Sequence, residues 1–167
     1  MLSDTHLRTG SPGRSGSERQ LPPLAWRYVG RADVVLHAGD ILDEGVLAML
    51  GESAPVKAVL GNNDRSLVGH LPGTLQLELA GVRIGMVHDS GPRPGRAQRL
   101  RRRFPEADLV VFGHSHVPVA EAGTDGQLLF NPGSPTQKRS QPVHTMGWLV
   151  LEDGRVAERS IVPLDAP

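Results

Sequence analysis

The chain has 167 residues, 18 basic and 18 acidic side chains and no cysteine. This length suits a single domain, residues 1–167, with a sizeable core, and the lack of cysteine excludes disulfides and thiol chemistry. A formal net charge of zero provides no overall field that would attract nucleic acid or an anionic membrane. No apolar run approaches the roughly 18 residues of a membrane helix, and no signal peptide opens the chain, so we expect a cytoplasmic protein.

The first third of the chain alternates apolar strand patterns with helix patterns. Because strands usually run about five or six residues, the first strand looks truncated, with only Met1 and Leu2 before Ser3-Asp4. A segment rich in Gly, Ser and Arg follows it and predicts a flexible loop. The expected order is a truncated strand over 1–6, a flexible loop over 8–20, a helix over 21–30, a buried parallel strand over 33–40, and a helix over 43–50.

The rest of the chain is richer in strand patterns. Asp153-Gly154 between two alternating runs is a strong hairpin signal. The expected elements are strands over 56–60, 71–79, 82–87, 109–112, 128–130, 147–151 and 155–162, with a basic helix over 95–104. We therefore predict an α/β (α+β) fold in four layers, with two mixed β-sheets packed as a sandwich and flanked by helices.

Candidate metal ligands follow the expected strands in five short blocks. They offer carboxylate, amide and imidazole donors and no thiolate, a set that suits Mn, Fe, Ni, Zn or Mg rather than a cysteine-based zinc site. The carboxyl ends of strands in an α/β sheet are where ligands bind. We therefore predict a two-metal hydrolytic centre. The seven donors are Asp4, His6, Asp40, Asn62, His88, His114 and His116.

Two pairs of donors are two residues apart. In extended chain, Asp4 and His6 point to the same side and can reach one metal, as can His114 and His116. Taken by itself, Asp4-x-His6 is better explained as a surface turn.

The other donors also have ordinary structural explanations. Asp40 can bridge two metals about 3.5–4 Å apart, but it can also cap the helix that begins near Asp43. Asn62 can be a left-handed turn residue, and His88 a histidine with satisfied hydrogen bonds at a strand end. The occurrence of all of these donors together, each at the end of a strand, favours the metal centre.

The combined pattern resembles the calcineurin-like metallophosphoesterase superfamily. The matching motifs are Asp-x-His, Gly-Asp, Gly-Asn-x-Asp, an isolated His and Gly-His-x-His. The small single-domain, YfcE-like phosphodiesterases are the most similar branch, and Asn131-Pro132-Gly133-Ser134 is a further match to them. The resemblance extends over nearly the whole chain.

The resemblance implies a ligand set for each of two divalent cations, of which Mn²⁺ is the expected choice. Asp4, His6 and His116 would hold one ion. Asn62, His88 and His114 would hold the other, and Asp40 would bridge the two. Asp40, Asn62 and His88 are accordingly the expected catalytic residues. A hydroxide that bridges the metals would attack the phosphorus of a small organic phosphate, most simply a phosphodiester.

The sequence departs from the wider superfamily after Asn62. Many members have a histidine at this position that is thought to protonate the leaving group, whereas this chain has Asn63, which cannot act as a general acid. The phosphodiesterase branch often lacks that histidine as well. We therefore expect substrates whose leaving groups need little protonation. Asp64 is expected to orient Asn62 or His6.

Other functions remain open at this stage. A non-catalytic interaction scaffold on the same fold is one alternative, and a phosphomonoesterase or a nuclease is another. The expected partner is a small phosphate ester. A nucleic-acid partner is not expected, because the arginines over 96–103 predict a solvated helix face and the chain has few aromatic residues. No membrane partner is expected, and the sequence leaves a homo-oligomer open.

Overall fold

The computed structural model describes residues 1–8 and 20–165. The loop predicted over 8–20 therefore lies outside the described residues, apart from its two ends. Three α-helices are present in the described part: α1 (Pro23–Val29), α2 (Glu44–Gly51) and α3 (Arg96–Arg103). None of the helices in this part of the chain is long and apolar enough to cross a membrane.

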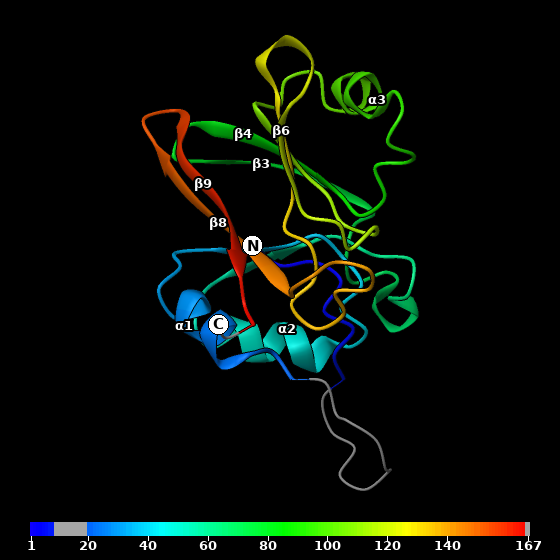
Figure 1. Cartoon of the computed structure of the whole chain (residues 1–167), viewed down its shortest axis with the longest axis vertical. Coiled ribbons are helices and arrows are strands. Elements are labelled where there is room, and N and C mark those ends of the chain that lie inside the picture. The colour runs from blue at the N-terminus through cyan, green and yellow to red at the C-terminus, as the bar shows by residue number, and fades with distance from the viewer. Residues whose placement is uncertain (9–19, 166–167) are drawn as a thin grey trace, which may run out of the picture.

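A five-stranded mixed sheet forms the upper part of the molecule in Figure 1. Its strands follow the order β3-β4-β5-β7-β6, with parallel pairing in the centre and antiparallel pairing at both edges. The sequence did not predict β6, because this edge strand is mostly exposed and carries no apolar pattern. The strands are β3 (Thr74–Leu79), β4 (Val82–Val87), β5 (Leu109–Val111), β6 (Val119–Ala122) and β7 (Leu128–Asn131).

The second sheet is assembled from two strand pairs. β1 (Val35–His37) pairs in parallel with β2 (Val56–Ala58), and β8 (Thr145–Glu152) pairs antiparallel with β9 (Arg155–Pro163). Asp153 and Gly154 between β8 and β9 have φ angles of 49° and 75°, as a two-residue hairpin turn requires.

The first two residues join these pairs into one mixed sheet. Leu2 donates its N–H to Leu36 and accepts from the N–H of Ala38, each at 2.9 Å, in a parallel bridge to β1. Met1 and Gly147 of β8 exchange hydrogen bonds of 2.6 and 3.0 Å, which is an antiparallel pattern. The strand predicted at the start of the chain is thus a short bridge of Met1 and Leu2, which connects β1 to β8.

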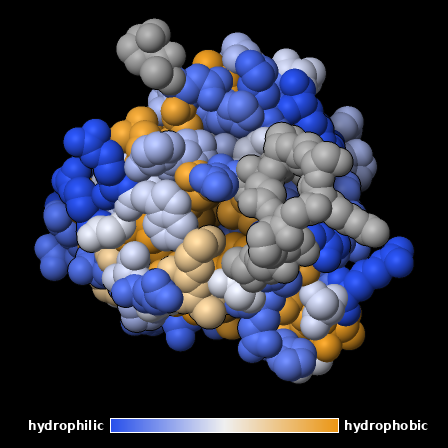
Figure 2. Space-filling view, turned by 90° about the horizontal axis from the view of Figure 1, so that it is seen from below, coloured by the Kyte–Doolittle hydropathy of each residue, from blue (hydrophilic) through white to orange (hydrophobic). Residues whose placement is uncertain are grey.

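The core lies in three layers between four layers of secondary structure. One cluster packs α1 and α2 against the second sheet, and it includes Ala25, Val46 and Met146. A second fills the space between the sheets, and a third packs α3 against the five-stranded sheet. In a view from below, hydrophilic residues cover much of the surface, and hydrophobic residues show near the middle (Figure 2). The predicted fold of two mixed sheets flanked by helices is confirmed.

The arginines of α3 differ from the predicted solvated face. Arg99 donates to the backbone carbonyls of Ser90, Pro92 and Pro94 and so holds the loop before the helix. Arg96 is buried, with its guanidinium 5.0 Å from the centroid of the Phe112 ring. The prediction was wrong for these two residues, since a guanidinium can pack on an aromatic face and satisfy carbonyls as well as face water.

Candidate metal centre

The predicted donors lie together at the carboxyl ends of the strands, but their backbone is not extended. Asp4 and His6 have φ angles of 53° and 45°, and His114 and His116 have 68° and 59°. The period-two explanation for these pairs was therefore wrong. Asp4 and His6 reach the same site, whereas His114 and His116 reach two different sites, and in each pair two left-handed residues flank a central one. Such backbone is uncommon for residues other than glycine, and it clusters at functional sites.

Glycines allow the donor-bearing loops to approach one another closely. A Cβ on Gly61 would lie 2.2 Å from the backbone nitrogen of Asp40, and a Cβ on Gly113 would lie 1.8 Å from Oγ of Ser3. No side chain fits either gap. This explains in physical terms why glycine precedes Asn62 and His114.

The buried donor group consists of Asp4, His6 and His116. Oδ1 of Asp4 lies 3.3 Å from Nε2 of His116, and Nε2 of His116 lies 3.4 Å from Nε2 of His6. The side chains of Asp4 and His116 are fully buried. One ligand atom from each member lies within 4.8 Å of the others, so a single ion can contact all three.

The open donor group consists of Asn62, His88 and His114. Oδ1 of Asn62 is 3.1 Å from Nε2 of His88 and 3.0 Å from Nδ1 of His114. His88 is buried, whereas Asn62 and His114 are exposed. Asn62 does not adopt the left-handed conformation that the turn explanation required. The group therefore has three donor atoms close together, with two of its three side chains, those of Asn62 and His114, open to solvent.

Asp40 lies between the two groups. Its Oδ2 is 3.5 Å from Nε2 of His6 in the buried group and 3.5 Å from Nε2 of His88 in the open group. Asp40 does not cap α2, because Asp43 occupies that position and makes no side-chain cap hydrogen bond. One carboxylate oxygen thus faces both donor groups, which is the position of a bridging ligand.

The acidic side chains of the site favour their ionised forms. Burial opposes ionisation of Asp40, but hydrogen bonds from His88 and from the Asn63 backbone outweigh it and lower the pKa of that carboxyl. Burial likewise opposes the charge on His88, yet its contact with Asp40 raises the pKa of the imidazole. Burial also opposes ionisation of Asp4, but the nearby His116 imidazole and the hydrogen bond from Ser3 to Oδ2 outweigh it and lower the pKa of that carboxyl.

A buried oxygen in the site lacks a hydrogen-bond partner. Oδ1 of Asp4 is buried and accepts no hydrogen bond from any residue that the structure describes, although it belongs to a carboxylate with a lowered pKa. Leaving such an oxygen unsatisfied costs free energy. A cation beside the imidazoles would satisfy it, so the donor set fits a divalent metal.

Backbone carbonyls orient two of the imidazoles. Nδ1 of His88 lies 2.7 Å from the carbonyl oxygen of Ala38, and Nδ1 of His116 lies 2.5 Å from that of Gln137. Because a carbonyl only accepts, Nδ1 carries a proton in both rings, so in the neutral form of each ring Nε2 presents its lone pair to the site. This is the usual arrangement around histidines that bind metals.

Asp64 fixes the loop that carries Asp40, not Asn62 or His6 as the sequence suggested. Its carboxylate accepts backbone hydrogen bonds of 2.7–2.9 Å from four N–H groups. The prediction was wrong because donors from a loop distant in sequence cannot be seen in the sequence. The donors are the N–H groups of Asp40, Ile41, Leu42 and Gly61.

His37 supports the site in a way that the sequence did not reveal. Its Nδ1 accepts from the Gly39 N–H at 3.2 Å, so its Nε2 carries the proton and donates to Oγ1 of Thr5 at 3.0 Å. Burial lowers the pKa of His37 to about 3. His37 therefore links the residue between Asp4 and His6 to the turn before Asp40. In the sequence it resembles any packed strand residue.

Ser134 and Thr136 hold the Asp4–His6 segment from the other side. Oγ of Ser134 donates to the Asp4 carbonyl at 2.8 Å, and Oγ1 of Thr136 donates to the Thr5 carbonyl at 2.5 Å. The segment Asn131-Pro132-Gly133-Ser134 is the only sequence signal for this contact. These contacts keep the buried group ordered close to the start of the chain.

Comparison with known proteins identifies the family. Residues 1–154 match the calcineurin-like phosphoesterase superfamily domain. The chain is 31% identical over 169 residues to a probable metallophosphoesterase of Methanothermobacter thermautotrophicus, a match that spans 100% of this chain and 92% of that one. It is 32% identical to a probable metallophosphoesterase of Methanocaldococcus jannaschii, over 99% and 80% of the two chains. The chain belongs to the calcineurin-like phosphoesterase superfamily, as the motifs predicted.

Solved structures share the fold at lower sequence identity. Vps29 of Entamoeba histolytica in complex with Zn²⁺ superposes with a TM-score of 0.72 at 21% identity, over 98% of this chain and 97% of that one. An archaeal phosphodiesterase superposes with a TM-score of 0.64 at 19% identity, over 96% and 97%. These similarities establish the fold. The activity has to be inferred from the residues of the site.

Proposed function

We propose that this chain is a phosphodiesterase that depends on two divalent cations and hydrolyses a small organic phosphate. The observation that carries the proposal is the position of Asp40, whose Oδ2 lies 3.5 Å from an imidazole nitrogen of each donor group. The orphaned oxygen of buried Asp4 adds independent support. The curated relatives named probable metallophosphoesterases place the chain among hydrolases of phosphate esters.

Each donor group would hold one cation, and Asp40 would contact both. Bound divalent cations would lower the pKa of a water molecule and neutralise charge on the phosphoryl group. Mn²⁺ is our first choice, and Ni²⁺, Zn²⁺, Fe²⁺ and Mg²⁺ share the same donor chemistry. Asp64, His37 and the carbonyls of Ala38 and Gln137 keep the ligands in position.

The exposed side of the site is where the substrate would bind. Asn62 and His114 are exposed, so a phosphate ester can approach the open donor group directly. Asn63 donates from Nδ2 to Oδ2 of Asp40 at 2.7 Å. An amide cannot protonate a leaving group at neutral pH. We therefore propose a preference for diesters with good leaving groups and a cytoplasmic small-molecule substrate.

The direct test is hydrolysis of bis(p-nitrophenyl) phosphate by metal-stripped protein, with and without Mn²⁺. We expect turnover that depends on the metal and exceeds that of the monoester p-nitrophenyl phosphate. A control variant for later Asp→Asn substitutions in the site is Asp165→Asn, because Asp165 is a carboxylate that pairs with His144 on the surface. Faster monoester turnover would indicate a phosphomonoesterase. No turnover and no binding of Mn²⁺, Ni²⁺ or Zn²⁺ would favour the interaction scaffold.

The leaving group can be tested separately with Asn63→His. If Asn63 cannot protonate the leaving group, the variant should raise the hydrolysis rate of diesters with poor leaving groups more than that of bis(p-nitrophenyl) phosphate. Asn63→Gln, which preserves the amide, should not change the selectivity. Equal rates for Asn63→His across the series would refute this explanation of leaving-group preference.

A further inference from the structure

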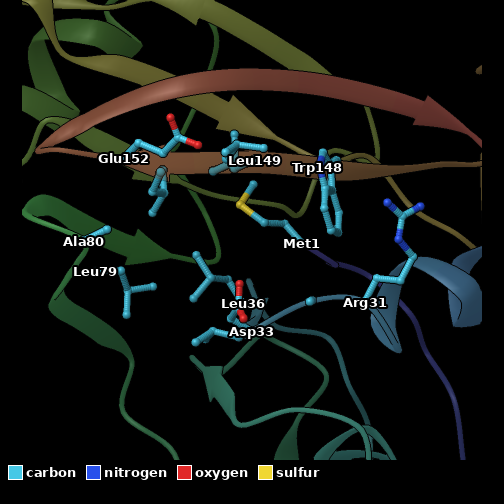
Figure 3. Close-up of a pocket in the computed structure, with 13 residues that line it drawn as sticks. Met1, Arg31, Asp33, Leu36, Leu79, Ala80, Trp148, Leu149 and Glu152 are labelled. Atoms are coloured by element: carbon cyan, nitrogen blue, oxygen red, sulfur yellow. The ribbon is translucent and has the colours of Figure 1, made fainter.

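A cavity and a cluster of arginines lie outside the metal centre. The cavity has a volume of about 530 Å³ and lies between β8 and Leu36, where its charged lining residues are Asp33, Glu152 and Arg31 (Figure 3). Because two carboxylates oppose one guanidinium there, the lining of the cavity does not favour an anion. The arginine cluster lies at the start of α3 and consists of Arg93, Arg96 and Arg99.

Arg96 is a buried cation without a charged or hydrogen-bonded partner. Only 9% of the residue is exposed, and its Nε is buried with no hydrogen-bond partner. Among the residues that the structure describes, none makes an ion pair with this guanidinium, which lies 5.0 Å from the ring centroid of Phe112. Burial lowers the pKa of Arg96, yet an arginine side chain remains charged at neutral pH. An enclosed charge without a partner costs free energy, and a bound anion would offset that cost.

The first turn of α3 offers unpaired N–H groups at the same end of the helix. The helix begins after Gly95 with no side-chain cap hydrogen bond and no acidic residue in its first turn. The N–H groups of Ala97 and Gln98 have no acceptor within the described part of the chain. Free N–H groups and the helix dipole together favour an anion at this position.

The Arg96 side chain is directed toward these N–H groups, since side chains on an α-helix lean toward its N-terminus. Charged groups that act on its guanidinium include Asp89 and Arg93 in the loop before α3, and Glu121 on β6. Arg99 donates to backbone carbonyls of the same loop, so it fixes the loop and adds a positive charge. Three guanidinium groups thus stand against two carboxylates, which leaves positive charge in excess.

We propose that the start of α3 binds the anionic group of a small ligand, a phosphate or a carboxylate, between Arg96 and the first free N–H groups of the helix. Guanidinium and backbone N–H groups both form strong hydrogen bonds to such oxyanions. Asp89 follows His88, and Phe112 is two residues before His114, so the site lies beside the loops that carry the open donor group. The anion is a second acidic group of the substrate, which rests on the proposed function, or a separate small anion.

Titration of the metal-free protein with inorganic phosphate, followed by NMR, tests the site without relying on the proposed activity. We expect saturable shifts of the amide signals of Ala97 and Gln98. The amides of Leu36 and Leu149, which line the cavity, should not shift and serve as an internal control. The wild-type protein alone can therefore refute the proposal, because unchanged signals of Ala97 and Gln98 would overturn it.

A matched pair of substitutions tests the role of the buried guanidinium. Arg96→Met keeps an unbranched side chain against Phe112 but removes the charge, and it should weaken phosphate binding roughly tenfold or more. Its Tm without phosphate should equal or exceed that of wild type, because a buried unpaired charge is lost. Arg102→Met should bind phosphate like wild type, since Arg102 is exposed in the last turn of α3. Equal phosphate affinity of Arg96→Met and wild type would overturn the proposal.

Kinetics of the Mn²⁺-loaded protein distinguish the two sources of the anion. The substrates are bis(p-nitrophenyl) phosphate and a diester with a carboxylate on one ester arm. If Arg96→Met raises KM for the carboxylate diester alone, the anion belongs to the substrate. Equal KM values, together with the loss of phosphate binding, would assign the site to a separate small anion. An inactive wild-type protein would refute the proposed function, whereas the phosphate titration would still decide the anion site.

Discussion

The buried donor group and the open donor group use similar ligands but are held differently. Asp4 and His116 are fully enclosed, and contacts from Ser134 and Gln137 restrain their segments. Asn62 and His114 are exposed and contact each other through a single amide oxygen. Because charges interact more strongly away from water, the buried group should bind its cation more tightly. The open group should exchange its cation faster and meet the substrate.

The largest expected effect comes from removing the charge shared by the two groups. Asp40→Asn keeps the shape of the side chain but removes the anionic bridge. We expect turnover of bis(p-nitrophenyl) phosphate to fall roughly thousandfold, since several kcal/mol of stabilisation at about 1.4 kcal/mol per factor of ten would be lost. Asp165→Asn should retain full turnover. Near-wild-type activity of Asp40→Asn would refute the bridging role.

A matched pair of substitutions sharpens the difference between the groups. His116→Ala should eliminate the tightly bound ion, and His114→Ala should weaken only the second one. Calorimetric titration with Mn²⁺ measures both steps. We expect His114→Ala to recover much of its turnover at high Mn²⁺, whereas His116→Ala should not. Equal losses in the two variants would mean that burial does not distinguish the groups.

Asp64→Asn tests whether the open and buried groups depend on one supporting carboxylate. The substitution places an amide N–H against some of the four backbone donors that Asp64 accepts. We expect a loss of about 10–100-fold in Mn²⁺ affinity or activity, which is typical for residues that orient metal ligands. Circular dichroism checks that the variant is folded. Unchanged Mn²⁺ affinity in the folded variant would contradict the positioning role.

The smallest effect concerns His37, which supports the segments on the buried side. Burial lowers the pKa of His37 to about 3 from its usual value of 6.5. Between these pH values the unfolded chain binds the extra proton, so the stabilisation is complete above pH 6.5 and declines as the pH falls. The free energy of unfolding should decrease by up to about 1.4 kcal/mol per pH unit from this residue.

Urea denaturation of the metal-free protein between pH 6.5 and 4.5 measures this dependence. His37→Gln should show a shallower decline than wild type, while retaining the opposite contribution of His88, whose pKa is raised. Parallel declines in the two proteins would contradict a neutral, buried His37.

The sequence predicted which side chains gather at the site better than it predicted the contacts that hold them there. Most of the strands, and the seven candidate donor residues that follow them, could be read from apolar runs that end near Asp, Asn or His. The left-handed backbone of Asp4 and His116 could not be predicted, because contacts such as that of Ser134 with the Asp4 carbonyl impose it. Asp64 was misassigned for the same reason, since its four donors come from two loops.

The strand pairing in the two sheets also has features that the sequence did not predict. The sequence predicted a short strand at Met1 and Leu2, but it did not show that these residues join β1 to β8 through four backbone hydrogen bonds. β6 was missed because an exposed edge strand does not need an apolar pattern. The hydrophobic pattern of a sequence indicates which residues are buried. The Met1–Leu2 bridge and β6 depend instead on backbone hydrogen bonds between strands, which the pattern does not indicate.

The central claim is that Asp40 joins two metal ions, and electron paramagnetic resonance of the Mn²⁺-loaded protein tests it most directly. Metal-stripped protein should bind two Mn²⁺ per chain and give the spectrum of an exchange-coupled pair. Asp40→Asn should lose the coupling. A wild-type protein that binds a single ion, or two ions without coupling, would contradict the account.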